Sequence, residues 1–182
     1  LAGNIWHVIS EEGLEPDPVT VAIRPHVFTS WEVADPSGTT LLFKLNPNVF
    51  IHNMAPWNGR QFTAEDAAWN LERIGGLYSE RLKIPQSAFQ RATMVLNMTK
   101  AEAVDPLTVK MILSTPVADL DAGLYGQGRF GIMAPAQLNS GEACATNMIG
   151  SGPFKLKDYK QNEATIVVRN PDYWQKGYPK AK

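Results

Sequence analysis

The chain contains a single cysteine, Cys144, in 182 residues, so no disulfide can form within it. This cysteine lies in the small and polar stretch 141–146, and no histidine is near it in the sequence. A reactive thiol needs a neighbouring base or cation that stabilises the thiolate. We therefore expect an inert thiol and not a catalytic nucleophile.

An excess of positive charge is also missing. Lys and Arg together number 17 and Asp and Glu number 18, which gives a formal net charge of -1. Binding to the phosphates of nucleic acid needs clustered basic residues, so nucleic acid is disfavoured as a partner. Hydrophobic residues make up 44% and charged residues 19%, which is the balance of a folded globular chain with a buried core.

No run of apolar residues approaches the ~20 that a membrane-spanning helix requires. Residues 1–4 carry neither the positively charged start nor the apolar stretch of a signal peptide. Two expectations are compatible with this pattern: a protein that stays in the cytoplasm, or a sequence that starts after its signal. The residues alone leave both open.

Patterns that carry catalysis, metal binding or cofactor binding are missing as well. His7, His26 and His52 lack the i, i+4 spacing of a helical metal site, and we interpret His52 as a solvated or hydrogen-bonded loop residue. The adjacent carboxylates Glu65 and Asp66 fit a helix start better than acid–base catalysis. The glycines from 123 to 131 are not followed by the Lys-Ser/Thr pair of a phosphate-binding loop. We therefore predict no catalytic residue, no metal and no cofactor.

Among the patterns that are present, a period of two predicts one clear strand. Leu41, Phe43 and Leu45 fall on one face of a strand over residues 39–45. The strand follows Asp35–Gly38, where proline in the second position and glycine in the fourth are typical of a turn.

The strongest helix signal runs from Ala64 to Ile74. Thr63 is a suitable N-cap, and Asp66 stands three residues later, so each side chain is placed to accept the other residue's backbone N–H. Apolar residues recur on one face at helical spacing. The glycine pair 75–76 ends the predicted helix.

Weaker patterns complete the outline. The first thirty residues are predicted to be irregular because Pro16, Pro18 and Pro25 interrupt them. Further strands are expected at 94–98, 103–104, 109–113, 130–133, 154–159 and 164–169, with a type I turn at 105–108 and a short helix at 116–124. Hairpins mixed with a few helices predict an α+β or mixed α/β layer structure.

Two further features are interpreted as structural. The segment Gly150–Pro153 fits a bend with positive φ ahead of a strand. The five tryptophans are expected to pack in a core or in a seam between domains, and stacking of one of them on a ligand is the less favoured alternative.

Six short motifs follow one another in a fixed order along the chain. They are Ile23–Val33 with the strand after it, Phe50–Asn53 with Phe62–Asp66, Leu71–Ile74, Ala103–Asp105 with Thr108–Val109, Gly150–Leu156, and Arg169–Trp174. In this order they resemble the motifs P-x-L-A-E-S-W-E-V, F-H-D-G with F-T-A-E-D-V, S-L-E-R-I, A-V-D-D-x-T-V, G-T-G-P-Y-K-L and R-N-P-D-Y-W of family 5 extracellular solute-binding proteins. Asn53 stands where that family usually has Asp.

The resemblance implies a periplasmic-binding-protein type II-like lobe, built from a small mixed sheet and hairpins with a few packed helices. It implies that residues 14–135 form a second-lobe-like region and that residues 1–13 and 136–182 are pieces of a first lobe. A third lobe, which grips most of the ligand in such proteins, has no counterpart in this sequence. By the resemblance, the chain is expected to be a fragment of a longer protein.

The resemblance also implies a function without catalysis. Members of the family capture peptides or similar small solutes outside the membrane and then dock onto an ABC permease. We therefore expect a periplasmic or extracellular location, either free or with a lipid anchor in the full-length form, and no cofactor. The second lobe touches ligand at one or two loops, which makes these residues the ligand-facing candidates: Tyr125, Gln127, Arg129 and Phe130.

Two alternatives to solute import stay open at this point. One is an extracellular sensory or chaperone-like interaction domain with the same fold, since solute-binding proteins diverge in that direction. The other is a hydrolase or transferase whose catalytic residues lie elsewhere, for which no residue pattern in the chain argues.

Overall fold

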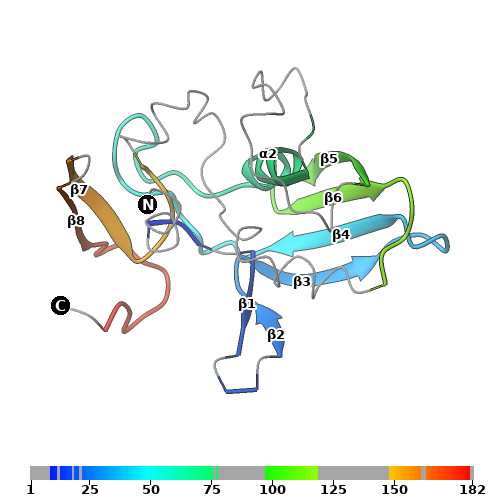
Figure 1. Cartoon of the computed structure of the whole chain (residues 1–182), viewed down its shortest axis with the longest axis horizontal. Helices are drawn as coiled ribbons and strands as arrows, with labels where there is room; N and C mark the ends of the chain where they lie inside the picture. Colours follow the sequence, from blue (N-terminus) through cyan, green and yellow to red (C-terminus); the bar gives the residue numbers. More distant parts are fainter. Residues whose placement is uncertain are drawn as a thin grey trace.

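The computed structural model of the chain describes residues 9–11, 13–17, 19–20, 22–75, 77, 97–118, 148–160 and 163–180 (Figure 1). Their elements are β1 (Leu14–Pro16), β2 (Ile23–Pro25), β3 (Phe28–Val33), β4 (Thr40–Leu45), α2 (Ala64–Gly75), β5 (Met98–Asp105), β6 (Thr108–Leu113), β7 (Phe154–Lys160) and β8 (Ala164–Arg169). One sheet has the strand order β3-β4-β6-β5, and the pairs β1–β2 and β7–β8 form two further sheets. All five strand pairs in these sheets are antiparallel.

Strand β4 lies in the middle of the four-stranded sheet and turns one face to the core. Leu41, Phe43 and Leu45 are buried, whereas Lys44 between them is exposed. The ring of Phe43 packs against that of Phe28 on β3, with 4.9 Å between the ring centroids. The strand predicted here is confirmed, because alternation along a strand decides which side chains reach the core.

The opposite face of this sheet carries charged side chains. Glu102 of β5 forms ion pairs with Lys100 on its own strand and with Lys110 on β6. Hydrogen bonds from these two lysines lower the pKa of the Glu102 carboxyl to about 2. Lys44 of β4 donates a hydrogen bond to the Thr108 hydroxyl at 2.8 Å. An antiparallel sheet commonly has one solvated face of this kind.

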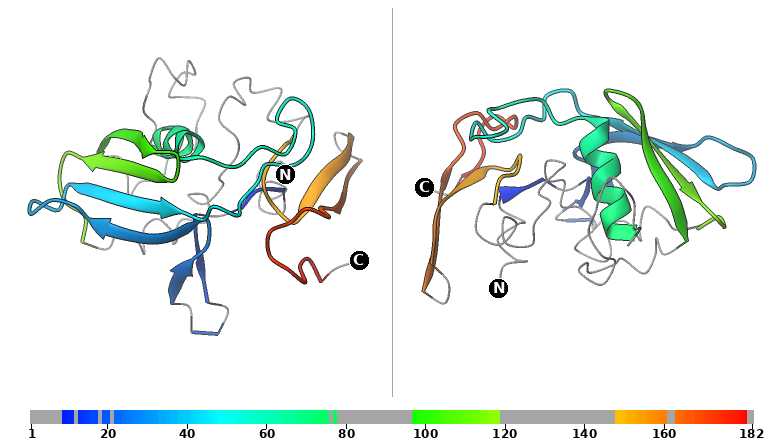
Figure 2. Two further views of the ribbon diagram at one scale, coloured as in Figure 1. Left: turned by 180° about the vertical axis from the view of Figure 1, so that it is seen from behind. Right: turned by 90° about the horizontal axis from the view of Figure 1, so that it is seen from above.

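Helix α2 packs against β5 and β6 (Figure 2). Its first turn is held by Asp66, which is 1% exposed. The Asp66 carboxylate accepts the backbone N–H of Thr63 at 3.0 Å and the Thr63 hydroxyl at 3.1 Å. Arg60 donates two more hydrogen bonds to it, at 2.6 and 2.7 Å, and this contact raises the pKa of the guanidinium. The predicted helix and the capping role of Asp66 are confirmed.

The two predicted turns are present. The Gly38 N–H donates to the Asp35 carbonyl at 3.1 Å, and Gly38 has a φ of 73°, which favours glycine. The Asp35 carboxylate accepts hydrogen bonds from the Ser37 hydroxyl and from the N–H groups of Thr40 and Thr39. These bonds lower its pKa to about 2. The second turn joins β5 to β6 in the predicted hairpin.

The prediction of an irregular start to the chain is wrong. Strands β1 and β2 pair as a short hairpin, in which Leu14 lies opposite Pro25 and Pro16 lies opposite Ile23. Both strands are edge strands of a two-stranded sheet, where proline is tolerated because its missing N–H does not interrupt a ladder on both sides. Strand β3 was also not predicted, because its residues do not alternate between apolar and polar; its pairing with β4 holds it in the sheet.

Strands β7 and β8 form the predicted hairpin at the end of the molecule away from α2 (Figures 1 and 2). Leu156 and Val167 pair on one face and are half-buried. On the other face Ile166 and Val168 are 44% and 41% exposed.

Several predictions fall on residues that the structure does not describe. These are the strand at 130–133, the residues 94–96 ahead of β5, and most of the helix expected at 116–124. Among the described residues, no helix combines the length and the apolar character needed to cross a membrane.

Replacing Asp66 with Ala removes the acceptor that Thr63 and Arg60 share. We expect the free energy of unfolding to fall by about 2–4 kcal/mol, because a helix cap and the partner of a charged group are lost together. Urea unfolding followed by circular dichroism measures this loss. The matched control Glu65→Ala removes an exposed carboxylate from the same turn and should cost about 0.5 kcal/mol or less. Equal losses in both variants would contradict the role given to Asp66.

Candidate functional site

The residues predicted to face a ligand lie outside the described part of the chain: Tyr125, Gln127, Arg129 and Phe130. The described residues instead bring three of the sequence motifs together at one junction. Segments 50–53, 150–153 and 169–174 meet there, and residues 9–11 lie against them. We call this region the glycine junction.

The backbone of Gly150 and Gly152 is packed directly against residue Ile9. The Gly152 N–H donates to the Ile9 carbonyl at 2.8 Å. A methyl group at Gly150 would lie 2.3 Å from the Ile9 oxygen and 2.3 Å from the Ser10 hydroxyl oxygen. The bend with positive φ predicted here is wrong, since neither glycine has a positive φ. Glycine is required because two backbones approach closely, and a side chain would not fit.

The imidazole of His52 fills the space beside the two glycines. His52 is 1% exposed, its Nε2 lies 3.0 Å from the Gly152 carbonyl oxygen, and the Gly150 N–H points to its Nδ1 at 3.4 Å. This pattern assigns the proton of a neutral ring to Nε2. Burial lowers the pKa of His52 to about 4. The positive charge of Lys155 also lowers this pKa, whereas the hydrogen bond to the Gly152 carbonyl raises it. The expected hydrogen-bonded histidine is therefore found, but it is an internal one.

Asn170 closes the junction from the other side. Its side-chain amide donates to the Gly152 carbonyl at 3.1 Å, and its Oδ1 accepts the backbone N–H of Asp172 at 3.2 Å. Its own N–H donates to the Pro153 carbonyl at 2.8 Å. Asn170 is buried, and the Gly152 carbonyl thus accepts one hydrogen bond from Asn170 and one from His52.

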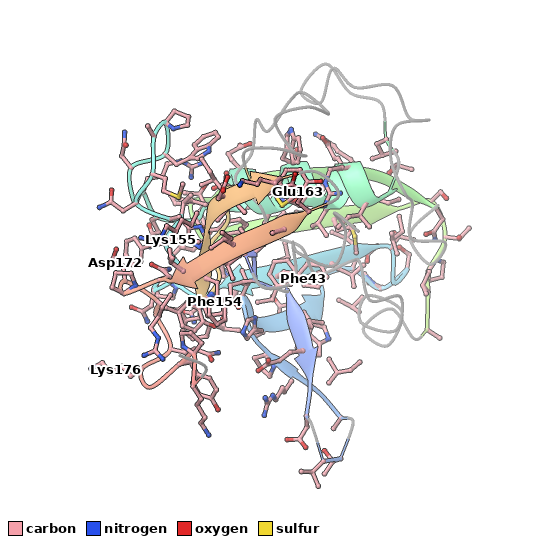
Figure 3. The ribbon with its side chains drawn as sticks, turned by 60° about the vertical axis from the view of Figure 1, so that its left-hand side comes forward. Phe43, Phe154, Lys155, Glu163, Asp172 and Lys176 are labelled. Atoms are coloured by element: carbon pink, nitrogen blue, oxygen red, sulfur yellow. The ribbon has the colours of Figure 1, made fainter. Side chains whose placement is uncertain are left out.

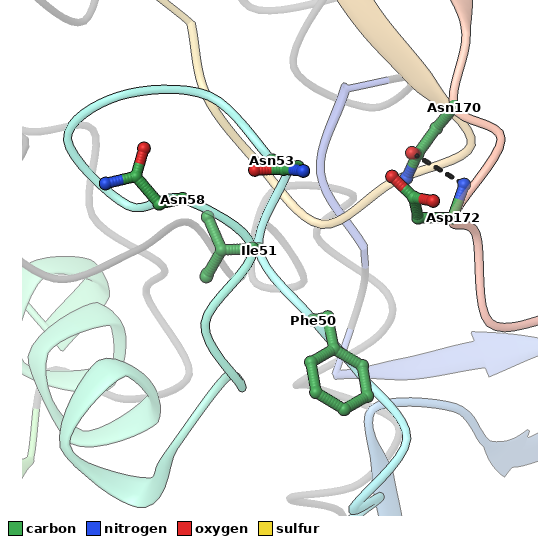
Figure 4. Close-up of a pocket in the computed structure, with 7 residues that line it drawn as sticks. Phe50, Ile51, Asn53, Asn58, Asn170 and Asp172 are labelled. Carbon is green, nitrogen blue, oxygen red and sulfur yellow. Dashed lines mark hydrogen bonds between the residues drawn. The ribbon is translucent and has the colours of Figure 1, made fainter.

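A pocket of about 290 Å³ opens beside the glycine junction (Figure 4). Its lining consists of Phe50, Ile51, Asn53, Asn58, Gly59, Asn170 and Asp172. Asn53 and Asp172 line the pocket from different segments of the chain, the loop that also carries Asn58 and the turn after β8. Lys155 lies 3.4 Å from the Asp172 carboxylate and offsets its charge, as Figure 3 shows at the base of the β7–β8 hairpin.

The chemistry that this pocket offers is hydrogen bonding. Carboxamide groups supply donors and acceptors, the carboxylate supplies an acceptor, and the half-exposed ring of Phe50 supplies an apolar edge. Catalysis would need a nucleophile beside a base, or two carboxyl groups with different environments. The described lining residues form neither arrangement. The described residues also contain no cluster of three or more His, Cys, Asp or Glu side chains that would hold a metal ion.

Sequence reasoning did not single out the residues of this pocket as a site. Asn53 and Asp172 were recognised only as members of separate motifs, more than a hundred positions apart in the chain. The pair Asn58-Gly59, both with positive φ, is a turn signal visible in the sequence, and it marks the loop that shapes one wall. This loop meets the 170–172 turn only in the folded chain, so the sequence alone does not predict the pocket between them.

Comparisons with known proteins all find solute-binding proteins. The family model described as bacterial extracellular solute-binding proteins, family 5 Middle, matches residues 22–182. The chain is similar to the glutathione-binding protein GsiB of Pectobacterium atrosepticum, with 29% identity over 143 residues that cover 79% of this chain and 25% of the relative. The chain therefore spans about a quarter of the length of this relative.

Two solved structures show the same backbone arrangement. The periplasmic binding protein DppA from Helicobacter pylori in complex with the peptide STSA aligns at a TM-score of 0.70 and 27% identity, covering 92% of this chain and 34% of that one. The dipeptide-binding protein from Pseudoalteromonas sp. SM9913 in complex with Met-Leu aligns at 0.75 and 20% identity, covering 96% and 36%. The second likeness concerns the fold alone. The predicted fold class is confirmed.

Replacing Gly150 with Ala forces a methyl group to within 2.3 Å of the Ile9 carbonyl oxygen. We expect a loss of about 3 kcal/mol or more in the free energy of unfolding, because backbone on both sides must shift. Gly177→Ala is the matched control: no atom lies within 4 Å of the added methyl group, and only the strain of a positive φ, about 1 kcal/mol, applies. Chemical denaturation of both variants measures the two losses. A loss in Gly150→Ala no larger than that in Gly177→Ala would contradict the close approach of the Gly150 and Ile9 backbones.

Replacing His52 with Gln tests the buried neutral imidazole. Above pH 6.5 the ring is neutral in both the folded and the unfolded chain, so its stabilising contribution is complete. As the pH falls from 6.5 toward about 4, His52 is protonated in the unfolded chain but stays neutral in the folded chain. The free energy of unfolding should therefore fall by up to about 3 kcal/mol in the wild type.

The Gln variant should lose this part of the pH dependence, because its amide does not titrate. Urea unfolding at a series of pH values between about 7 and about 4 measures the difference between the two proteins. The same decline in both would mean that His52 is not the group responsible.

Proposed function

Because the chain belongs to family 5 of the bacterial extracellular solute-binding proteins, we propose that it serves in the capture of a small solute for an ABC importer. The observation that carries this proposal is the family match over residues 22–182. Peptides or similar small solutes are the proposed cargo, since one relative is a glutathione-binding protein and one similar structure holds the peptide STSA.

The proposed role is binding without catalysis. The family is made up of solute-binding proteins, and the chemistry of the glycine junction is consistent with such a role. His52 is turned inward and engaged by two backbone groups, and Asp172 is paired with Lys155. These side chains support a fixed shape and not the transfer of protons to a substrate.

We also propose how the chain is divided. Residues 14–135 form the second-lobe-like region, and residues 1–13 and 136–182 belong to the first lobe. The contacts at the glycine junction cross this boundary, since His52 bonds to Gly150 and Gly152 and the ring of His26 packs 5.4 Å from that of Trp174. Such packing supports two regions that move as one body, with hinge motion occurring elsewhere in the receptor.

The β7–β8 hairpin supports a place in a larger structure. In the described part of the chain these two strands pair only with one another. A two-stranded hairpin is marginally stable by itself, and here one face also leaves Ile166 and Val168 exposed. Solute would be enclosed between this body and another part of the receptor, with Tyr125, Gln127, Arg129 and Phe130 as the proposed ligand-facing residues.

The remaining parts of the proposal concern location and partner. We place the protein outside the cytoplasmic membrane, in the periplasm or at the cell surface, free or held by a lipid anchor. Its proposed protein partner is the permease of the importer, which would receive the closed, solute-loaded form.

Calorimetry on two proteins tests the proposal. The 182-residue chain should bind glutathione and dipeptides with a Kd weaker than about 1 mM, because half of a cleft does not desolvate a ligand. The native gene product, whose length intact-mass measurement establishes, should bind one of these solutes in the range of about 1–10 µM. Micromolar binding by the 182-residue chain would contradict the proposal that this chain forms only half of the ligand-binding cleft.

Two other outcomes would count against the transport role. One is a native product that ends near Lys182 and binds none of these solutes. The other is a native product that binds solute without stimulating the ATPase activity of any ABC permease whose gene lies near its own, which would favour the sensory alternative.

A further inference from the structure

The β7–β8 hairpin has one protected edge and one open edge. On β7, Lys157 and Lys160 are exposed, and the register shift between Leu156 and Asp158 makes Lys157 an extra residue that bulges from the ladder. Lysines and bulges are features by which natural sheets prevent a further strand from pairing. On β8, residues Ala164–Val168 carry no charge, no proline and no bulge. The open edge is therefore that of β8.

Strand β8 also carries apolar side chains on both of its faces. Val167 lies opposite Leu156 and is half-buried, whereas Ile166 and Val168 on the other face are 44% and 41% exposed. A run of β-branched residues such as Thr165–Val168 is typical of a strand that has neighbours on both sides. In the described part of the chain, β8 pairs with β7 alone, in a hairpin at the end of the molecule away from α2.

Two copies of β8 complement one another in an antiparallel register. A two-fold axis perpendicular to the sheet places residues of the same face opposite each other, so the axis passes through one residue of the strand. With the axis at Ile166, this residue faces its own copy, and Ala164 faces Val168. Thr165 then faces Val167. The apolar and β-branched side chains of the strand are thereby matched along its length.

Neighbouring registers fit the fold less well. An axis at Val167 would place Ala164 opposite Asn170, which is buried in the glycine junction and is not accessible to a second copy. An axis at Thr165 would leave Val168 and Arg169 without an opposite residue in β8. The register centred on Ile166 is the one in which the strand pairs without disturbing the junction.

The same register makes the charges at the two ends of the strand complementary. Glu163, exposed at the tip of the hairpin, lies opposite Arg169 of the second copy, and the two-fold symmetry repeats this pair (Figure 3). Opposite charges directly across an antiparallel ladder are stabilising, and like charges there are destabilising. The guanidinium has five N–H donors, so this pairing leaves room for the contact that Arg169 makes within its own chain.

We propose that two copies of this chain form a dimer through the β8 edge. The two hairpins then make one antiparallel sheet in the order β7-β8-β8-β7, with Ile166 on the two-fold axis. The exposed Ile166 and Val168 side chains of both copies meet on one face of this sheet and cover one another. A two-stranded hairpin is marginally stable, whereas more strands with an apolar face stabilise a sheet. The dimer goes beyond solute capture and does not depend on it.

Sedimentation equilibrium of the 182-residue chain tests the dimer. The wild type should change from monomer to dimer as its concentration rises through about 10–100 µM. A wild type that stays monomeric up to about 1 mM would overturn the proposal, and would leave a strand from a longer native product as the occupant of the edge.

The variant Ile166→Lys places two positive charges on the two-fold axis. Its dimer should be weakened by about tenfold or more, because like charges then lie directly opposite each other. Val104→Lys is the matched control: Val104 is 57% exposed on the edge strand β5, whose register shifts and charged residues already oppose pairing. This control should dimerise like the wild type. Equal dimerisation of the two variants would overturn the proposal.

A charge exchange tests the register. Glu163→Arg and Arg169→Glu each place like charges opposite one another at both ends of the seam, so each variant alone should dimerise about tenfold more weakly than the wild type. In an equimolar mixture, every such position again joins one acidic and one basic side chain. The heterodimer should therefore form at wild-type concentrations, and native mass spectrometry separates it from the homodimers by mass.

Two results would overturn the proposed register. One is a mixture of folded variants that gives no more heterodimer than either variant gives homodimer. The other is wild-type dimerisation by both variants alone. Circular dichroism establishes that each variant is folded. If Arg169→Glu fails to fold, the losses expected for Glu163→Arg and Ile166→Lys still decide the proposal.

Discussion

The structure depends on the backbone groups of one residue, Gly152. Its carbonyl accepts a hydrogen bond from His52, 100 residues earlier in the chain, and another from Asn170, 18 residues later. Its N–H reaches the backbone of Ile9. Each of these bonds replaces one to water, and each would leave a buried polar group without a partner if it were broken. The close approach of backbones makes glycine necessary here, and the neutral imidazole of His52 is the part of the junction that acid disturbs.

The local elements were predictable where a short stretch of sequence carries its own signal. Strand β4, the β5–β6 and β7–β8 hairpins and helix α2 follow from alternation, turn residues and the cap at Thr63 and Asp66. Strands β1, β2 and β3 were missed because nothing local distinguishes them: the first two are three residues long and end at prolines, and the third is held by its neighbour β4. Their formation is a result of tertiary pairing, which overrides weak propensity.

The family was predictable, but the site was not. Six weak motifs in the right order were enough for the family, which the match over residues 22–182 shows. The glycines at 150 and 152 were recognised as special, but for the wrong reason, since only the fold brings Ile9 against them. The pocket between Asn53 and Asp172 was invisible in the same way. A motif indicates which residues of a segment are important. It does not predict which distant segment those residues contact in the fold.

The long separation between His52 and Gly152 has a consequence for the order in which the chain assembles. Strands β4 and β6 can pair as soon as residue 113 has been made, whereas the imidazole must wait for a partner that lies 100 residues beyond it. At a synthesis rate of about 5–20 residues per second, that interval is roughly 5–20 seconds. During translation the loop around His52 therefore lacks this partner while the strands before residue 113 are already able to pair, and closing the glycine junction expels water from between segments made at different times.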